Sequence, residues 1–360
     1  MDKLYQAALR CVPGIGNTRL SALIDYFGDG ITVWQAKHDD LIFSHILDTE
    51  TCNKFIKGRE KIDIQYLSSH WNKLDIKIIT RGCDEYPDQL RNVYDAPQVL
   101  FYKGILPDNR NLIAIVGARK ASPYGKNAAR MIAGDLARSG CWVVSGAARG
   151  IDTAAHEGAL DAGYTIAVIG NGININYPPE NARLLSRIAA CGAVISEYPP
   201  DTPPVPGHFP ARNRIINGLS LGVVIIEAAE KSGALITADY ALEEGRDVFA
   251  VPGSIFSETS KGCHRLIKQG AKLVENASDI LEDYQIQLSS PLRADTLNTE
   301  EEGVMQLLQY ETSLSLEEMA IKSTLAPTRL TYILLQLELR GLVAQQNGQR
   351  YIRIAGRKSE

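Results

Sequence analysis

Residues 112–169 decide the fold and read LIAIVGARKASPYGKNAARMIAGDLARSGCWVVSGAARGIDTAAHEGALDAGYTIAVI. The stretch contains three short runs rich in Val and Ile, Leu112–Val116, Trp142–Ser145 and Thr165–Ile169, each followed directly by a glycine. Residues with a helical spacing of apolar side chains fill the gaps between these runs. Short, continuous apolar runs are typical of parallel strands that helices cover on both faces. The stretch therefore predicts βαβ units.

The same alternation continues further along the chain. Three more runs predict strands, at Ala193–Ser196, Gly222–Ile226 and Val248–Val251. We therefore expect an α/β fold whose core is a Rossmann-like, mostly parallel sheet over residues 79–288. Ligands of such sheets bind beyond the carboxyl ends of the strands, so the functional residues are expected there.

Residues 1–78 show short helical patterns around the tetrad Pro13-Gly14-Ile15-Gly16. The tetrad fits the turn of a helical domain of the helix-hairpin-helix or SAM-like kind, because glycine accepts a positive φ and leaves backbone N–H groups open to a phosphate. The turn equally suits plain packing of two helices, since few cations flank it. Both interpretations stay open at this point.

A polar segment over residues 289–302 predicts a linker to a small C-terminal domain over residues 303–360. Three helical patterns and a hairpin centred on Asn347-Gly348 together predict a winged helix. The helix after Pro327 begins with polar side chains but continues as Tyr-Ile-Leu-Leu, so duplex reading and a protein-contact or structural role remain alternatives. The helical patterns lie at Val304–Leu308, Leu316–Ala320 and Leu330–Leu339.

The 360 residues carry a net charge of −4, with 45% hydrophobic and 22% charged residues. This composition indicates a globular chain without a uniformly basic surface, so any nucleic-acid binding must come from a local cluster of Lys and Arg. The six cysteines are scattered, with no CxxC pair, which predicts neither a metal site nor a disulfide framework. Without a signal peptide or an apolar run of about 20 residues, we expect a cytoplasmic protein that does not enter a membrane.

Two predicted strand-to-helix junctions, residues 115–125 and 144–152, place glycines beside cationic side chains. Backbone N–H groups at a helix start, together with Arg or Lys, favour binding of a phosphate. The second junction also fits a tight turn capped by Asp152. Neither junction has the GxGxxG spacing of a dinucleotide site, so a nicotinamide-dependent oxidoreductase is disfavoured and no cofactor is expected. The candidate contacts are Gly117, Arg119 and Lys120 in the first junction and Ser145, Gly146, Arg149 and Gly150 in the second.

Two later segments repeat this chemistry. A proline-stiffened stretch, residues 199–210, leads through Phe209 into a helix that begins with cations and an amide, which suits stacking and backbone contacts with an unpaired strand. Alternatively, Phe209 packs in the core and the arginines pair with Glu197 or Glu227. Histidines 156 and 264 fit helix-face or surface positions better than the role of a base. The candidate contacts are Phe209, Arg212, Asn213 and Arg214, followed by Lys231, Ser232 and Gly233 at the next strand end.

These blocks resemble the DNA-processing protein A family, also called DprA or Smf. The likeness is carried by residues 115–125, SGAARGIDTAAHEGA at 145–159, AVIGNGININYP at 167–178, FPARNRIINGLS at 209–220, SGALITADYALEEGRDVFAVPG at 232–253 and residues 262–271. Two positions depart from the usual pattern. Ala118 stands where Ser is common, which removes one hydroxyl, and His264 stands where Asn is usual, close to the expected dimer surface.

The resemblance implies a non-enzymatic protein that binds single-stranded DNA, forms a homodimer through the later part of the core, and loads the RecA recombinase during natural transformation. It implies that Arg119 contacts phosphate and that Phe209 stacks. It further implies that Ser145, Gly146 and Arg149 line the pocket, whereas Arg212, Asn213 and Lys231 hold the strand.

An enzyme remains the main alternative, because phosphoribohydrolases of the Lonely Guy type share this broad fold. They need a PGGxGT-like loop with a nearby glutamate. The chain has Lys231-Ser-Gly-Ala-Leu-Ile-Thr237 at the comparable junction, with Glu227 as the candidate glutamate. Several phosphate sites at one edge of a sheet suit a polyanion better than a single nucleotide.

Overall fold

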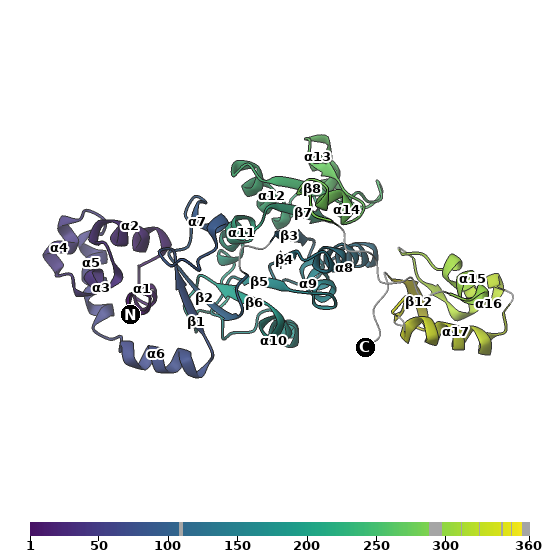
Figure 1. Ribbon diagram of the computed structural model, residues 1–360, viewed down its shortest axis with the longest axis horizontal. Helices are drawn as coiled ribbons and strands as arrows, with labels where there is room; N and C mark the ends of the chain where they lie inside the picture. The colour runs from purple at the N-terminus through teal and green to yellow at the C-terminus, as the bar shows by residue number, and fades with distance from the viewer. Residues whose placement is uncertain are drawn as a thin grey trace.

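The computed structural model describes residues 1–107, 111–287, 297–310, 312–323, 325–339, 341–346 and 348–354. Figure 1 shows a group of N-terminal helices, a central sheet covered by helices, and a small C-terminal domain following one another along the long axis. The predicted linker, residues 289–302, lies largely outside the described residues, as does Asn347 of the predicted hairpin turn.

The central sheet has nine strands in the order β1-β2-β6-β5-β4-β3-β7-β8-β9. Strands β3 to β9 pair parallel with one another, whereas β2 pairs antiparallel with β1 and β6. The predicted α/β class with a mostly parallel sheet is confirmed. The bounds are β1 Lys77–Thr80, β2 Val99–Gly104, β3 Leu112–Gly117, β4 Trp142–Ser145, β5 Thr165–Ile169, β6 Ala193–Ser196, β7 Gly222–Ile226, β8 Asp247–Ala250 and β9 Lys272–Leu273.

Helices cover both faces of this sheet. Apolar side chains alternate along each strand: in β3, Ile113 and Ile115 pack with Ile132 of α8, whereas Ala114 packs with Ile216 of α11. Burial on both faces explains why the strands are continuous apolar runs. The helices of this region are α7 Asp88–Arg91, α8 Pro123–Arg138, α9 Ile151–Leu160, α10 Ala182–Cys191, α11 His208–Leu219, α12 Gly233–Glu243, α13 Lys261–Lys268 and α14 Ser278–Leu281, with 3-10 turns η1 Pro179–Asn181 and η2 Glu258–Ser260.

The chain leaves β3 and β7 in opposite directions. After β3 it winds through β4, β5 and β6 on one side, and after β7 it continues to β8 and β9 on the other. Because β3 and β7 are neighbours, their carboxyl ends form the switch point of the sheet. A crevice opens at such a point because the two following loops move apart.

The N-terminal helices share a core with the sheet. Leu9 and Leu20 lie in the same apolar cluster as Phe101 of β2. The predicted turn joins α1 to α2 with Gly14 at φ +87° and Ile15 buried. The Asn17 side chain donates to Asp95 Oδ1 at 2.8 Å and accepts from the Gln98 N–H at 2.7 Å, which favours the packing interpretation of this turn. The bounds are α1 Asp2–Arg10, α2 Asn17–Phe27, α3 Gly30–Gln35, α4 His38–Phe43, α5 Thr49–Arg59 and α6 Ile64–Lys73.

The C-terminal domain consists of three helices and a three-stranded antiparallel sheet, the arrangement of a winged helix. This domain contacts α8 directly, since Nδ2 of Asn127 in α8 donates to the carbonyl of Arg353 in β12 at 3.1 Å. Arg329 of the would-be recognition helix is paired with Glu300 at 2.5 Å, which weakens the case for duplex reading. The bounds are α15 Thr299–Leu307, β10 Leu314–Ser315, α16 Leu316–Ser323, α17 Pro327–Leu339, β11 Val343–Gln346 and β12 Arg350–Arg353.

Across the described ranges, no helix combines the length and apolar character needed to cross a membrane. Within the same ranges, His, Cys, Asp and Glu side chains nowhere gather in groups of three or more that could bind a metal ion.

Candidate nucleic-acid interface

A pocket of about 370 Å³ opens at the switch point between β3 and β7. The loop after β3 forms one wall, and the loop after β7 with the start of α12 forms the other. Gly117 permits this approach, because a Cβ there would lie 1.8 Å from the carbonyl oxygen of Ile226. Close contact between the strand ends therefore sets the width of the pocket floor.

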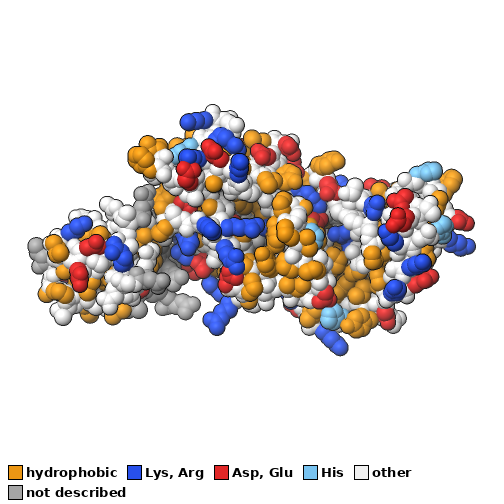
Figure 2. Space-filling view, turned by 180° about the vertical axis from the view of Figure 1, so that it is seen from behind, with side chains coloured by type: hydrophobic (Ala, Val, Ile, Leu, Met, Phe, Trp, Pro, Cys, Tyr) orange, Lys and Arg blue, Asp and Glu red, His pale blue; other side chains and the backbone are white. Residues whose placement is uncertain are grey.

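Cationic side chains border the pocket. Arg119 and Lys120 are exposed in the loop after β3, and Lys231 is exposed in the loop after β7. Among the described residues these three cations form no salt bridge; the Arg119 guanidinium lies 5.7 Å from the Phe209 ring centre and also attracts the buried Asp152. Figure 2 shows that Lys and Arg side chains also gather over the middle of the molecule beside the C-terminal domain. Unpaired cations around a concave site favour an anionic ligand.

Arg212 forms the floor of this site. Its side chain extends from α11, is 4% exposed, and donates to the carbonyl of Val168. Its Nε has no partner among the described residues. Burial lowers the pKa of Arg212 to about 10, which leaves the guanidinium charged at neutral pH. A buried, incompletely bonded guanidinium facing a pocket is a strong donor for a phosphate or a base edge.

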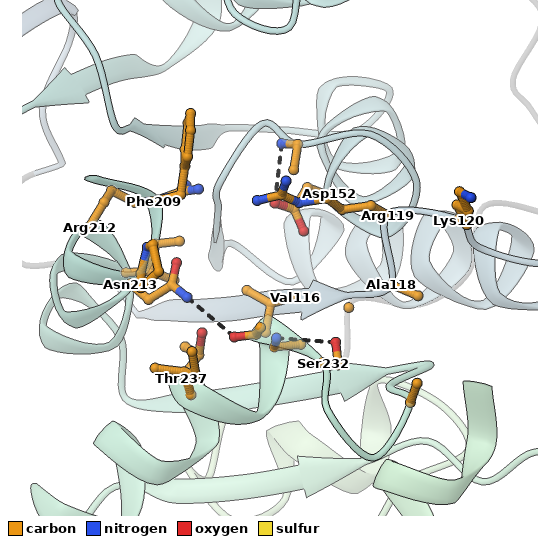
Figure 3. A pocket seen from close by; sticks show the side chains of 18 of the residues that line it. Val116, Ala118, Arg119, Lys120, Asp152, Phe209, Arg212, Asn213, Ser232 and Thr237 are labelled. Atoms are coloured by element: carbon orange, nitrogen blue, oxygen red, sulfur yellow. Dashed lines mark hydrogen bonds between the residues drawn. The ribbon is translucent and has the colours of Figure 1, made fainter. Parts of the chain in front are cut away.

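Asp152 lies across the pocket from Arg212, at the start of α9. Its carboxylate is buried and accepts from the Ala148 N–H at 3.2 Å. Burial raises the pKa of Asp152, whereas the neighbouring Arg212 opposes this rise. Figure 3 shows Arg119 and Asp152 on one side of the pocket and Phe209, Arg212 and Asn213 on the other.

Phe209 lines both the main pocket and a second, adjoining one of about 210 Å³. Its ring stacks on Tyr177, with ring centres 5.3 Å apart and an interplanar angle of 27°. The second pocket also contains Gly146 and Arg149, and Arg149 is ion-paired with the exposed Glu180. The partly exposed rings of Phe209 and Tyr177 provide a surface on which an unpaired base can stack.

The N-terminus of α12 closes the main pocket. Ser232 caps the helix, and its Oγ accepts from the Ala234 N–H at 3.3 Å. The Asn213 side chain reaches the carbonyl of Gly233 at 3.4 Å. The free N–H groups and the positive end of the helix dipole point toward the place where a phosphate would lie.

Most of the predicted site residues meet at the two pockets, although they come from four separate segments. Lys231 directly precedes the lining residue Ser232. The lining residues are Gly117, Arg119, Lys120, Gly146, Arg149, Phe209, Arg212, Asn213, Ser232 and Gly233.

Three predicted contacts lie elsewhere. Ser145 is fully buried and donates to the carbonyl of Ile115 at 2.6 Å, so it ties β4 to β3. Gly150 has φ +82° and packs its Cα against the carbonyl of Ala118, so it shapes the first loop. Arg214 pairs with Glu197 at 2.6 Å and Asp95 at 3.3 Å, the alternative left open for the arginines. We infer supporting roles for all three.

The structure also brings residues to the pockets that the sequence analysis did not propose as contacts. The sequence predicts Asp152 only as a helix cap and does not single out Tyr177 as a contact, yet Asp152 lines the main pocket and Tyr177 lines the second. Tyr177 precedes Pro178 in a polar loop, the same pattern that pointed to Phe209. An aromatic residue beside a proline in a polar loop is therefore the sequence feature from which Tyr177 could have been predicted. Nothing in the sequence pointed to Thr237 or Thr259, which line the main pocket through folding alone.

A comparison with protein families gives two matches. The profile of DNA recombination-mediator protein A matches residues 77–285, and that of the DprA winged helix domain matches residues 289–349. The chain belongs to the DNA recombination-mediator protein A family. The sequence resemblance and the winged-helix prediction are thereby confirmed.

Curated members of the family align over most of the chain. DNA processing protein DprA of Streptococcus pneumoniae is 42% identical over 76% of this chain and 95% of its own length. Protein Smf of Synechocystis is 35% identical over 98% of this chain and 99% of its own length. DNA processing protein DprA of Bacillus subtilis is 40% identical over 69% of this chain and 88% of its own length.

Two solved structures of family members are similar to this one. DNA processing protein A of Streptococcus pneumoniae is 39% identical, with a TM-score of 0.69 over 78% of this chain and 97% of that chain. DNA processing protein A of Helicobacter pylori, whose structure concerns a single-stranded DNA binding mode, is 30% identical, with a TM-score of 0.53 over 58% of this chain and 95% of that chain.

Proposed function

We propose that this member of the DNA recombination-mediator protein A family binds single-stranded DNA across the two pockets and does not act as an enzyme. One observation carries the proposal: Arg119, Lys120 and Lys231, which form no salt bridge among the described residues, lie around the buried Arg212, and the Phe209 ring lines both pockets. Cations that follow a backbone and an aromatic ring that stacks on bases are the two components of single-strand binding.

The arrangement favours an unpaired strand over other ligands. Two adjoining pockets that share an aromatic ring can accept successive nucleotides, whereas a single nucleotide would leave one pocket and several cations unused. In a duplex the bases are stacked and paired, so none is available to contact Phe209.

The finer parts of the proposal rest on likeness to the family. They are loading of the RecA recombinase onto incoming DNA during natural transformation, action as a homodimer, and a cytoplasmic location. Support comes from the matching of the family profile to residues 77–285 and from curated relatives named as DNA processing proteins.

The phosphoribohydrolase alternative is not favoured, because the carboxylate of its candidate glutamate, Glu227, is already hydrogen-bonded within the protein. Glu227 is 4% exposed, and its carboxylate accepts from both the backbone N–H and the hydroxyl of Ser122. This contact holds the start of α8, and Glu227 does not line the main pocket. His156 is buried on Thr165, and burial lowers its pKa to about 3, which leaves it no role as a base there.

The proposal is tested by fluorescence-anisotropy titration with single-stranded and double-stranded oligonucleotides of equal length at several salt concentrations. We expect a salt-sensitive preference for the single strand. Phe209→Ala should weaken this binding by about 1 to 3 kcal/mol, because one stacked base is lost. Absence of binding to either form would remove the proposal, and release of free base from AMP would revive the enzyme. An unchanged affinity of a folded Phe209→Ala protein would remove only Phe209 from the site.

Asp152 should make the binding depend on pH. A raised pKa means that Asp152 takes up its proton at a higher pH than an exposed aspartate does. A nearby phosphate favours the protonated form further, so affinity should rise as the pH falls from neutral toward the raised pKa. Asp152→Asn should bind more tightly at neutral pH and lose this dependence. Titrations at a series of pH values measure both effects, and an identical pH slope in the variant would contradict this role.

A further inference from the structure

A buried carboxylate fills the space in front of α8. Glu227 follows β7, is almost fully buried, and forms no salt bridge among the described residues. One of its carboxylate oxygens accepts from the Ser122 N–H at 2.8 Å, and the other accepts from the Ser122 hydroxyl. Ser122 is the N-cap of α8, a helix of 16 residues. The charge of Glu227 therefore lies at the positive end of the α8 dipole, the position that an anion prefers.

Gly125, in the first turn of α8, makes room for this carboxylate. A Cβ at position 125 would lie 2.4 Å from Oε2 of Glu227, and the three atoms nearest to that Cβ all belong to the Glu227 side chain. A larger residue at position 125 would push the carboxylate away from the helix. The start of α8 is thus shaped to hold a carboxylate from a residue 105 positions away from Ser122 in the chain.

The backbone of Glu227 is held in a conformation that serves the same contact. Its φ is +52°, a left-handed conformation that residues other than glycine rarely adopt. In this conformation its carbonyl accepts from the Ala118 N–H at 2.7 Å. Glu227 therefore binds both ends of the loop from Ala118 to Ser122, the loop that carries Arg119 and Lys120. A strained backbone of this kind persists only where its surroundings fix it, and such residues cluster at functional sites.

The position that Glu227 fills is the one that a nucleotide phosphate takes in many Rossmann-like sheets. There the phosphate lies at the N-terminus of the helix after the first strand. In this chain α8 follows β3, the first strand of the parallel part of the sheet. A phosphate that approached the Ser122 N–H would have to displace a buried carboxylate and lie beside its like charge.

We propose that Glu227 is a specificity-determining residue: its carboxylate takes the place of a phosphate at the N-terminus of α8 and so excludes nucleotides from the junction after β3. A built-in group of the wrong charge is a common way to reject a competing ligand. Arg119 and Lys120 still line the main pocket, so these cations serve a ligand that does not use the start of α8. Glu227 thereby selects against single nucleotides on a fold that commonly binds them.

The test is to empty this position and to offer it an anion. Glu227→Ala removes the carboxylate, and inorganic phosphate and AMP are the probes. At about ten times its dissociation constant, inorganic phosphate should raise the unfolding temperature of Glu227→Ala by about 2 to 5 °C more than that of the wild type. Scanning fluorimetry measures this temperature, with chloride at equal ionic strength as the reference. Calorimetric titration with either probe should show an additional site per chain in the variant.

Gly125→Ala provides the matched control. When it is combined with Glu227→Ala, the new methyl group lies where the carboxylate was, so the double variant should lose the additional response to phosphate at the same net charge. Phosphate that binds at Arg119 or Lys231 affects every variant and cancels in the comparison. Glu227→Gly is the second variant, because glycine accepts the positive φ at this position without strain.

An equal response to phosphate in the wild type, in Glu227→Ala and in the double variant would overturn the proposal and leave Glu227 as a structural brace. Failure of both Glu227→Ala and Glu227→Gly to fold in phosphate would also overturn it, because an external anion could not then replace the carboxylate. None of these measurements uses DNA. Binding of single-stranded DNA therefore stands or falls separately, in the anisotropy titrations.

Discussion

Replacing Arg119 and Lys231 together by alanine is expected to lower the affinity for single-stranded oligonucleotides by about 100-fold or more. Each cation contributes a charge-assisted hydrogen bond to a phosphate, worth about 1.5 to 3 kcal/mol. Each such contact also releases counterions, so the slope of log K against log salt should become shallower by about 1.4 in total. Anisotropy titrations at several salt concentrations measure both quantities.

The matched control removes two positive charges elsewhere. Arg187 on α10 and Lys268 on α13 are exposed and line neither pocket. Arg187→Ala with Lys268→Ala changes the net charge equally but should leave the salt slope close to that of the wild type. If both double variants lose the same affinity, the binding reflects general charge rather than the switch-point site.

Replacing Arg214 by alanine is expected to destabilise the fold by about 3 to 5 kcal/mol. The side chain of Arg214 is 10% exposed and that of its partner Glu197 is 5% exposed, so the substitution would leave a buried carboxylate without its cation. Arg214 also pairs with Asp95, which accepts a hydrogen bond from Asn17 of α2. Removing Arg214 should therefore also weaken the packing of the N-terminal helices on the sheet. Urea denaturation followed by circular dichroism measures the change in the free energy of unfolding.

Arg187→Ala provides the comparison for this prediction as well. Its pair with Asp161 is 3.9 Å long and solvent-exposed, and such pairs contribute about 0 to 1 kcal/mol. A similar free-energy change for the two variants would show that the buried pairs of Arg214 do not hold the structure together.

The strands and the position of the site could be predicted because the strands are buried on both faces. Burial forces a continuous apolar run, and the glycine that follows three of the predicted runs marks the point where the chain turns across the edge of the sheet. The short edge strand β9, with two residues, carries no such pattern. The antiparallel strands β1 and β2 were also not predicted, because each is only partly buried and so does not form a continuous apolar run.

The positions of Arg212, Asn213 and Arg214 at the start of α11 could be predicted only in part. On a helix, residues two apart point about 200° from each other, so Arg212 and Arg214 cannot face the same pocket. The sequence alone does not say which of them faces the sheet edge, because both have the same chemistry. The decision depends on Glu197 and Asp95, which are brought to Arg214 by folding and are distant from it in sequence.

The switch point joins segments that are more than 100 residues apart in the chain, since its walls come from Gly117 and from Gly233. The site therefore does not exist until the long-range pairing of β3 with β7 has formed. A ligand that needs both walls of the pocket binds only the native state, because the unfolded chain has no such binding site. Occupancy and folding are consequently linked, so single-stranded DNA bound as proposed is expected to stabilise the central sheet against unfolding.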